Sequence, residues 1–170
     1  MHRYKIWNGP MPTTAAQAAD TTTTVIKTML QLATPSTRQI QLIGWGFTLD
    51  TKPGATGVIE LIDTDVAATV TAHVASGVQP LTPGAPPSLL TLGTTATGFT
   101  ATAEGTITNT RTHDAVTLST VSAEAAPVLT YRYQFMPDER PIIAVSRFPR
   151  VRATTPTTAV NMRCFIVIDE

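Results

Sequence analysis

The sequence predicts an all-β protein, an antiparallel β-sandwich of the jelly-roll-like kind. Threonine makes up about one residue in five, and it favours pleated, half-buried strands over helices. About eight to ten short segments alternate or run apolar between frequent turn signals, which is the pattern of a sandwich. A hydrophobic content of 42% in 170 residues is enough for one domain with a real core.

Residues 1–22 form a segment of their own. Tyr4, Ile6 and Trp7 are apolar, and prolines and a glycine then break the chain before a small, polar run. We predict an extended N-terminal arm, or an edge strand, followed by a linker. A strand of the core sheet is the alternative. Residues 23–170 are predicted to form a single β-sandwich domain.

Strands are expected where apolar residues alternate or form short runs. In the clearest case, residues 38–50, the apolar parity changes at Ile43 and Gly44, and a β-bulge would restore the facing. Pro149 interrupts a later apolar stretch, which demotes that piece to an edge strand or a bulge. The other candidate strand segments are residues 24–33, 58–62, 98–103, 106–112, 115–121, 131–135, 142–145, 148–153 and 159–168.

One segment allows two secondary structures. Residues 63–65 can cap a short helix, because valines follow at helical spacing as far as Val74. The same stretch also alternates, through Val70, Ala72 and Val74, and its β-branched content disfavours a helix. We expect one short helix here, with a strand as the alternative.

The composition argues against several functional classes. Twelve basic and twelve acidic residues create no global field for nucleic acid or an anionic membrane, so neither is expected as a partner. Cys164 is the single cysteine, which excludes an intramolecular disulfide and a cysteine zinc site, and it lies in an apolar segment as a buried, inert thiol. No apolar run has the length of a membrane-spanning helix. The first residues lack the apolar core of a signal peptide, so synthesis in a cytoplasm without cleavage is expected.

No catalytic motif emerges from the residues. His113 and Asp114 are an adjacent histidine–acid pair, for which a hairpin turn is the expected setting. Glu60, Asp63 and Asp65 could donate oxygens to calcium, but their spacing does not match an EF-hand, and helix capping or solvation explains them better. We therefore expect no enzyme, no cofactor and no bound metal.

Arginine is concentrated in the C-terminal part of the chain. Its planar guanidinium bonds carboxylates and carbonyls while tolerating desolvation, so the cluster is a candidate protein interface. A solvated face is the main alternative; a nucleic-acid surface is disfavoured by the zero net charge and the interrupting Pro149. The six residues are Arg132, Arg140, Arg147, Arg150, Arg152 and Arg163.

Several stretches carry a resemblance to a known group of proteins. They read RFPRVRA (residues 147–153), VNMRCF (160–165), TMLQLATP (28–35) leading to GWG (44–46), and AHVASGVQP (72–80). In these stretches the chain resembles a group of small β-rich proteins of actinobacteria and their tailed phages. The resemblance covers most of the chain and carries no catalytic motif.

The resemblance implies a virion structural protein, made in the host cytoplasm and located on the capsid surface. It would be a decoration (cement) protein, a homotrimer that binds and stabilises the shell of the major capsid protein; this functional step is an analogy. The N-terminal segment, the proline-rich loop over residues 79–90 and the arginines would make the contacts. The candidate contact residues are Tyr4, Ile6, Trp7, Pro80, Pro83, Arg140, Arg147, Arg150 and Arg152.

A receptor- or glycan-binding head of a tail or fibre protein is the alternative function. Trp45, Tyr131 and Tyr133 could stack on sugar rings if they face solvent. Because they are in phase with aliphatic neighbours, we expect them to fill the core instead.

Overall fold

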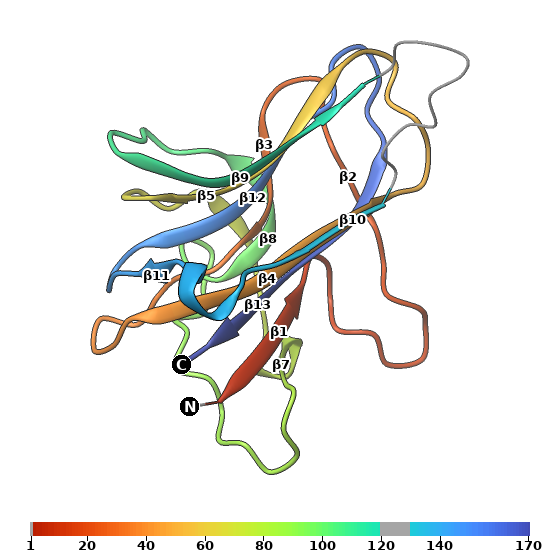
Figure 1. Cartoon of the computed structure of the whole chain (residues 1–170). Helices are drawn as coiled ribbons and strands as arrows, with labels where there is room; N and C mark the ends of the chain where they lie inside the picture. The colour runs from red at the N-terminus through yellow and green to blue at the C-terminus, as the bar shows by residue number, and fades with distance from the viewer. Residues whose placement is uncertain (1, 120–129) are drawn as a thin grey trace.

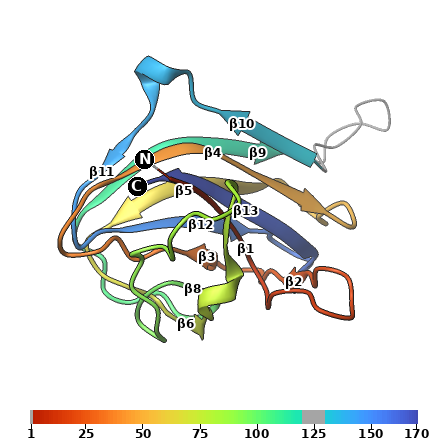
Figure 2. The same ribbon diagram turned by 90° about the horizontal axis from the view of Figure 1, so that it is seen from below.

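The computed structural model describes residues 2–119 and 130–170 of the chain. Two antiparallel β-sheets pack against each other, which confirms the predicted β-sandwich (Figure 1). In the described part of the chain, helical structure is confined to two 3₁₀ turns, η1 (Ala75–Gly77) and η2 (Pro137–Glu139). The view from below in Figure 2 shows the two layers and the loops that join them.

The first sheet, called sheet A, contains both ends of the described chain. Its order is β10 (Thr130–Gln134), β4 (Ile40–Leu49), β13 (Asn161–Asp169), β1 (Arg3–Trp7) and β7 (Val78–Pro80). Two short strands lie beside this path: β11 (Ile142–Ile143) pairs with β4, and β2 (Asp20–Thr21) pairs with β13. β4 and β13 form the centre of the sheet.

The second sheet, sheet B, has the order β6 (Thr69–Ala72), β8 (Gly98–Ala103), β3 (Lys27–Gln31), β12 (Phe148–Thr154), β5 (Gly57–Thr64) and β9 (Thr110–Leu118). β12 is a central strand, so the edge alternative for Pro149 is wrong; of the two expectations, the bulge is present in the pairing of β12 with β3, between Val151 and Arg152. Pro149 is tolerated because it is the second residue of β12, ahead of the pairing with β3, which begins at Arg150.

The core lies between the sheets and follows the period-two alternation of strands. On β13, Cys164, Ile166 and Ile168 are fully buried and face sheet B, as the apolar parity of that segment predicted. The predicted bulge in β4 is also confirmed: β13 pairs Val167 with Gly44 but its next residue with Leu42, so Ile43 is the extra residue.

The N-terminal segment is a strand inside sheet A. β1 pairs along its whole length with β13 on one side and with β7 on the other. Tyr4 and Ile6 face the core and are 1% and 0% exposed. The arm and edge-strand readings are corrected for these residues, because burial of two large side chains and pairing on both sides hold β1 within the sheet. The strand alternative describes them.

The expected short helix after residues 63–65 is absent. Residues 63 and 64 end β5, bends follow, and β6 then pairs with β8. Val70 is buried against Ala68 and Ala101, and its amide donates to the carbonyl of Thr94 over 2.7 Å. The β-branched residues here find a strand partner, which overrides the helical spacing of the valines.

Candidate functional site

The outer surface of sheet A carries an unusual group of side chains. Because Tyr4 and Ile6 face the core, Lys5 and Trp7 of β1 face outward. The same alternation on β13 points Phe165 away from the buried cysteine that precedes it. Trp7 and Phe165 are paired across the two strands, and their ring centroids are 5.0 Å apart.

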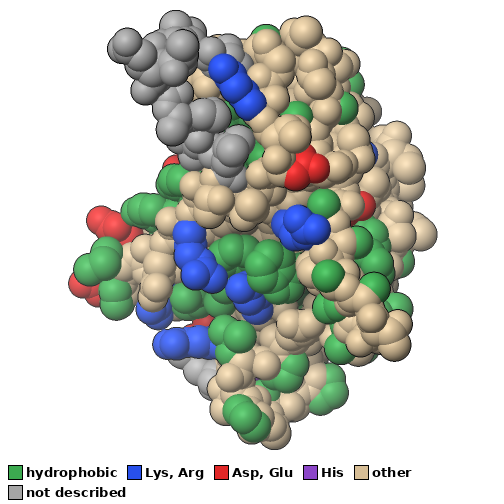
Figure 3. All heavy atoms as spheres, turned by 90° about the vertical axis from the view of Figure 1, so that its right-hand side faces the viewer, with side chains coloured by type: hydrophobic (Ala, Val, Ile, Leu, Met, Phe, Trp, Pro, Cys, Tyr) green, Lys and Arg blue, Asp and Glu red, His purple; other side chains and the backbone are tan. Residues whose placement is uncertain are grey.

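Glycines of β4 shape this surface. Gly46 lies beside Phe165 in the register, and a Cβ atom there would come within 2.9 Å of the Phe165 ring and 2.6 Å of the Tyr131 carbonyl oxygen. The ring therefore lies over a strand position that only glycine fits. Next to it, the bare Gly44 helps to form an open hollow of about 490 Å³. Basic side chains surround this apolar hollow in Figure 3.

Two cations lie against the aromatic pair. The Lys5 ammonium is 4.3 Å from the Trp7 ring centroid and 4.1 Å from that of Phe165. The Arg132 guanidinium, on the neighbouring edge strand β10, is 5.2 Å from the Phe165 centroid. Each such contact contributes about 0.5–1 kcal/mol at exposed sites.

These two cations have no carboxylate to neutralise them among residues 2–119 and 130–170. Burial lowers the pKa of Lys5, and the positive charge of Arg132 lowers it further. A third cation of the hollow, Arg3, is 3.8 Å from Asp169. The hollow has an apolar floor and a positively charged rim, and this combination favours the binding of an anion.

The predicted contact residues are divided by the structure. Trp7 belongs to the outer face, whereas Tyr4 and Ile6 are core residues; their expected role as contacts is corrected because no partner can reach them. Pro80 and Pro83 are exposed. Leu81, at the start of the proline-rich loop, lines the hollow. The N-terminal strand and this loop therefore meet at one surface.

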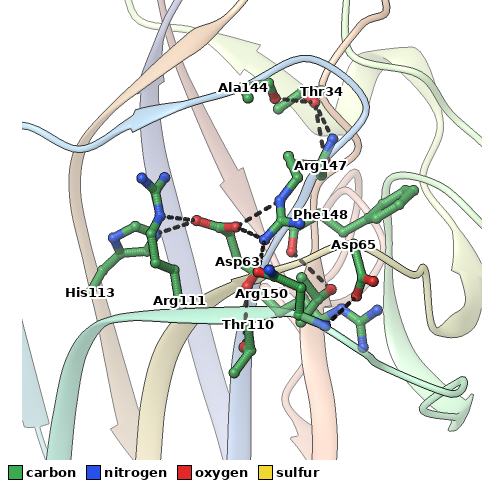
Figure 4. Close-up of polar contacts among 12 residues, drawn as sticks. Thr34, Asp63, Asp65, Thr110, Arg111, His113, Ala144, Arg147, Phe148 and Arg150 are labelled. Carbon is green, nitrogen blue, oxygen red and sulfur yellow. Dashed lines mark hydrogen bonds and ion pairs between the residues drawn. The ribbon is translucent and has the colours of Figure 1, made fainter.

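Most arginines of the C-terminal cluster form hydrogen bonds with groups of the protein itself. Figure 4 shows Arg147 and Arg111 bonded to the two oxygens of Asp63, which is 1% exposed. The Nε atoms of Arg147 and Arg111 donate over 2.9 Å each, and His113 Nε2 lies at the same distance from the carboxylate. Burial raises the pKa of Asp63, but the hydrogen bonds from Arg147 and Arg111 outweigh it and hold that pKa below its usual value.

Arg150 and Arg152 of β12 have internal partners as well. Arg150 is fully buried and donates to the Glu104 carbonyl over 3.1 Å and to the Val66 carbonyl. Burial lowers its pKa to about 10. Arg152 bonds Glu60 across β12 and β5 at 2.6 Å. Their charges have partners within sheet B, as the charge of Arg147 has, and their role in assembly stays a prediction.

Arg140 lies directly after η2 and is half-buried. Its Nε atom has no hydrogen-bond partner in the described part of the chain. Arg140 is not among the residues that line the hollow. Of the arginines expected to make contacts, it is the one without a carboxylate bond among residues 2–119 and 130–170.

The His113–Asp114 pair lies within β9, so the expected hairpin turn is corrected. The β5–β9 register skips His113, and this bulge separates the two side chains. His113 reaches Asp63, whereas Asp114 accepts hydrogen bonds from Trp45 Nε1 at 2.9 Å and from the Tyr131 hydroxyl at 2.8 Å. Both residues serve the contact between strands.

The aromatic residues considered for sugar stacking occupy different settings. Trp45 is fully buried and Tyr131 is packed against the core, as the core expectation held. Tyr133 is 37% exposed, so the core expectation is wrong for this residue. Sugar stacking is therefore open to Tyr133 and closed to Trp45.

The side chains of metal-ligating type and the single thiol of the described residues give little support for other chemistry. There, no group of three or more histidine, cysteine or acidic side chains is arranged to hold a metal ion. Cys164 is buried, and burial raises its pKa well above the usual value. The helical turns described above are too short to cross a bilayer.

Comparison with known proteins finds no family model, no curated protein and no solved structure that matches this chain. The resemblance drawn from the sequence therefore stays a prediction. Sequence reasoning had missed Lys5 and Phe165 as site residues. A signal was present, because Lys5 shares the parity of Trp7, opposite to that of Tyr4 and Ile6, and Phe165 occupies the polar parity of the last strand.

Proposed function

We propose that this protein is a non-enzymatic structural module of a phage virion. It binds the shell of the major capsid protein as a homo-oligomer and stabilises it, with the outer face of sheet A as the attachment surface. The observation that carries this proposal is a pair of cations, Lys5 and Arg132, that contact Phe165 beside an apolar hollow and have no carboxylate partner among the described residues.

The composition of this face supports attachment to protein. Tryptophan, phenylalanine and arginine are enriched at the centres of protein interfaces, where aromatic anchors contribute much of the affinity. Leu81 adds an exposed aliphatic side chain at the rim. On a shell with many equivalent sites, an oligomer converts a modest contact into tight binding through avidity.

The test is sedimentation with capsid shells assembled without this protein. Wild type is expected to pellet with shells, and Lys5→Glu and Arg132→Glu are each expected to stay in the supernatant, because a negative charge replaces one cation and forms an ion pair with the other. Lys52→Glu, in the exposed turn after β4, is the matched control and should pellet like wild type. Failure of the wild-type protein to bind shells would contradict the capsid proposal.

A glycan-binding head is the second candidate, favoured by one observation. Tyr133 is 37% exposed, and its ring makes an edge-to-face contact with the ring of Phe135, with centroids 5.0 Å apart, which holds it in place. A fixed, exposed ring can stack on a sugar. Specific hits on a glycan array that disappear in Tyr133→Ala, with no shell binding, would favour this function.

A further inference from the structure

We propose that the hollow of sheet A is a docking site for an acidic segment of a partner protein. A carboxylate side chain would lie between Lys5 and Arg132, and a neighbouring apolar side chain would lie on Phe165 and Val167. This inference rests on the proposed function, because it names the chemistry that the attachment surface recognises.

The charge pattern argues for a carboxylate. In sheet B, three arginines at or beside β12 have acidic partners: Arg147 has Asp63, Arg150 has Glu104 and Arg152 has Glu60. Lys5 and Arg132 contact the same aromatic ring and no acid among residues 2–119 and 130–170. An anion placed between them relieves their mutual repulsion and converts a desolvated charge into an ion pair.

The floor of the hollow argues for an apolar companion to that carboxylate. Phe165 and Val167 of β13, Ile43 of β4 and the exposed Leu81 line it. Gly44 lines it as well, and a Cβ atom there would come within 2.7 Å of the Tyr133 carbonyl oxygen, so this strand position requires glycine. A volume of about 490 Å³ suits a few side chains rather than a whole domain.

A protein segment fits these features better than a nucleic acid does. Nucleic-acid grooves follow the phosphate backbone with a track of cations, whereas Lys5 and Arg132 converge on one hollow. Arg163, the next basic residue along β13, is engaged with the carbonyl of Gln17 at 2.8 Å. The chain also has no net positive charge to attract a polyanion.

The test uses a synthetic peptide of sequence Glu-Leu-Asp-Phe-Glu, capped at both ends, and the full-length protein. The two tryptophans give two indole N–H signals in NMR spectra, and they report on different places. Trp45 donates its indole N–H to Asp114 inside the sandwich, whereas Trp7 lies on the outer face. The peptide should shift the Trp7 signal in a saturable way and leave the Trp45 signal in place.

A matched amide peptide and matched variants test whether the carboxylates of the peptide and the two cations of the hollow cause the binding. The amide peptide Gln-Leu-Asn-Phe-Gln should bind about tenfold more weakly or worse, since the carboxylates carry the recognition. Lys5→Gln and Arg132→Gln should each weaken binding of the acidic peptide by a similar factor, and Lys52→Gln should not. Both hollow variants remove charge without adding bulk, and unchanged NMR dispersion verifies their fold.

Three results would overturn the inference: equal binding of the two peptides, peptide shifts away from Trp7, or equal or tighter binding of a short oligothymidylate. The last would assign the hollow to phosphate groups. Shell binding without peptide binding rejects this inference and keeps the proposed function. Peptide binding without shell binding does the reverse.

Discussion

Asp63 is the residue on which the polar part of sheet B depends most. Its two oxygens accept hydrogen bonds from Arg111 and His113 of β9 and from Arg147, which directly precedes β12. The carboxylate is 1% exposed, so water contributes little to its solvation. One side chain thereby joins three neighbouring strands and pairs with Arg147, an arginine that the sequence suggested for a partner.

Replacing Asp63 with asparagine should destabilise the fold strongly. The amide keeps the shape but removes the charge that offsets Arg147, whose side chain is only 20% exposed. Breaking such a pair costs about 3–5 kcal/mol when fully buried, and the partial exposure of Arg147 reduces this to roughly 2–4 kcal/mol. Urea denaturation measures the change. Asp138→Asn in the exposed turn η2 is the control, and an equal loss in both variants would contradict the prediction.

Two histidines should make the stability depend on pH. Burial lowers the pKa of His73 and of His113 below the usual 6.5, and for His113 the hydrogen bond to Asp63 opposes this without reversing it. As pH falls through about 6.5, the unfolded chain takes up protons that the folded protein does not. Stability is therefore fully present above this pH and declines below it.

The measurement is the urea midpoint at about pH 7.5 and about pH 5.5. Wild type should unfold at lower urea in the more acidic buffer. His73→Gln and His113→Gln should each show a smaller difference between the two buffers, because each removes one titrating group. A difference that is the same in all three proteins would rule out this source of pH dependence.

At the scale of elements, the local sequence pattern predicted where strands form better than it predicted which strands pair with each other. The alternation in β13 and the bulge at Ile43 follow from local pattern alone, and both are as predicted. The helix after Asp65 failed because spacing of valines does not reveal that β8 lies ready to pair with β6. The prediction of an edge strand at Pro149 failed for the same reason, because the local sequence does not show which strands pair with β12.

The candidate site shows the same limit. Trp7 could be named from the sequence because it is an aromatic residue in a short, distinct segment. Its contact with Phe165 joins residues at opposite ends of the chain, and Arg132 arrives from a third strand. Such a cluster depends on sheet order, which short-range periodicity does not determine.

Removing residues 1–7 should unfold sheet A instead of detaching an arm. The deletion takes away β1, exposes an edge of β13, and loses the burial of Tyr4 and Ile6, worth about 1.5–3 kcal/mol each. Folded domains are stable by roughly 5–15 kcal/mol in total, so this loss is a large fraction. Circular dichroism and urea denaturation of the truncated protein measure it. A truncation with wild-type stability would contradict the role of β1 in the sheet.

At the scale of the whole molecule, charge balance and exposed apolar side chains favour self-association. The net charge of zero gives little repulsion between copies. The proline-rich loop exposes Leu81 and Leu89, at 51% and 49%, and it is held in place by the Tyr4 hydroxyl, which donates to the Pro86 carbonyl over 2.7 Å. A fixed loop loses little entropy when it enters an interface.

If this loop joins the proposed trimer, Leu89→Glu should dissociate it. Light scattering of wild type should give the mass of three chains, and the variant should give the mass of one, because a charge would be buried without a partner. Val25→Glu, at a 66% exposed position in the segment between β2 and β3, is the matched control and should keep the wild-type mass. Leu89 lies outside the set of residues that line the hollow, so the monomeric variant should still bind the acidic peptide. Equal masses for both variants would contradict a place for the loop in the interface. A monomeric wild-type protein would contradict the trimer.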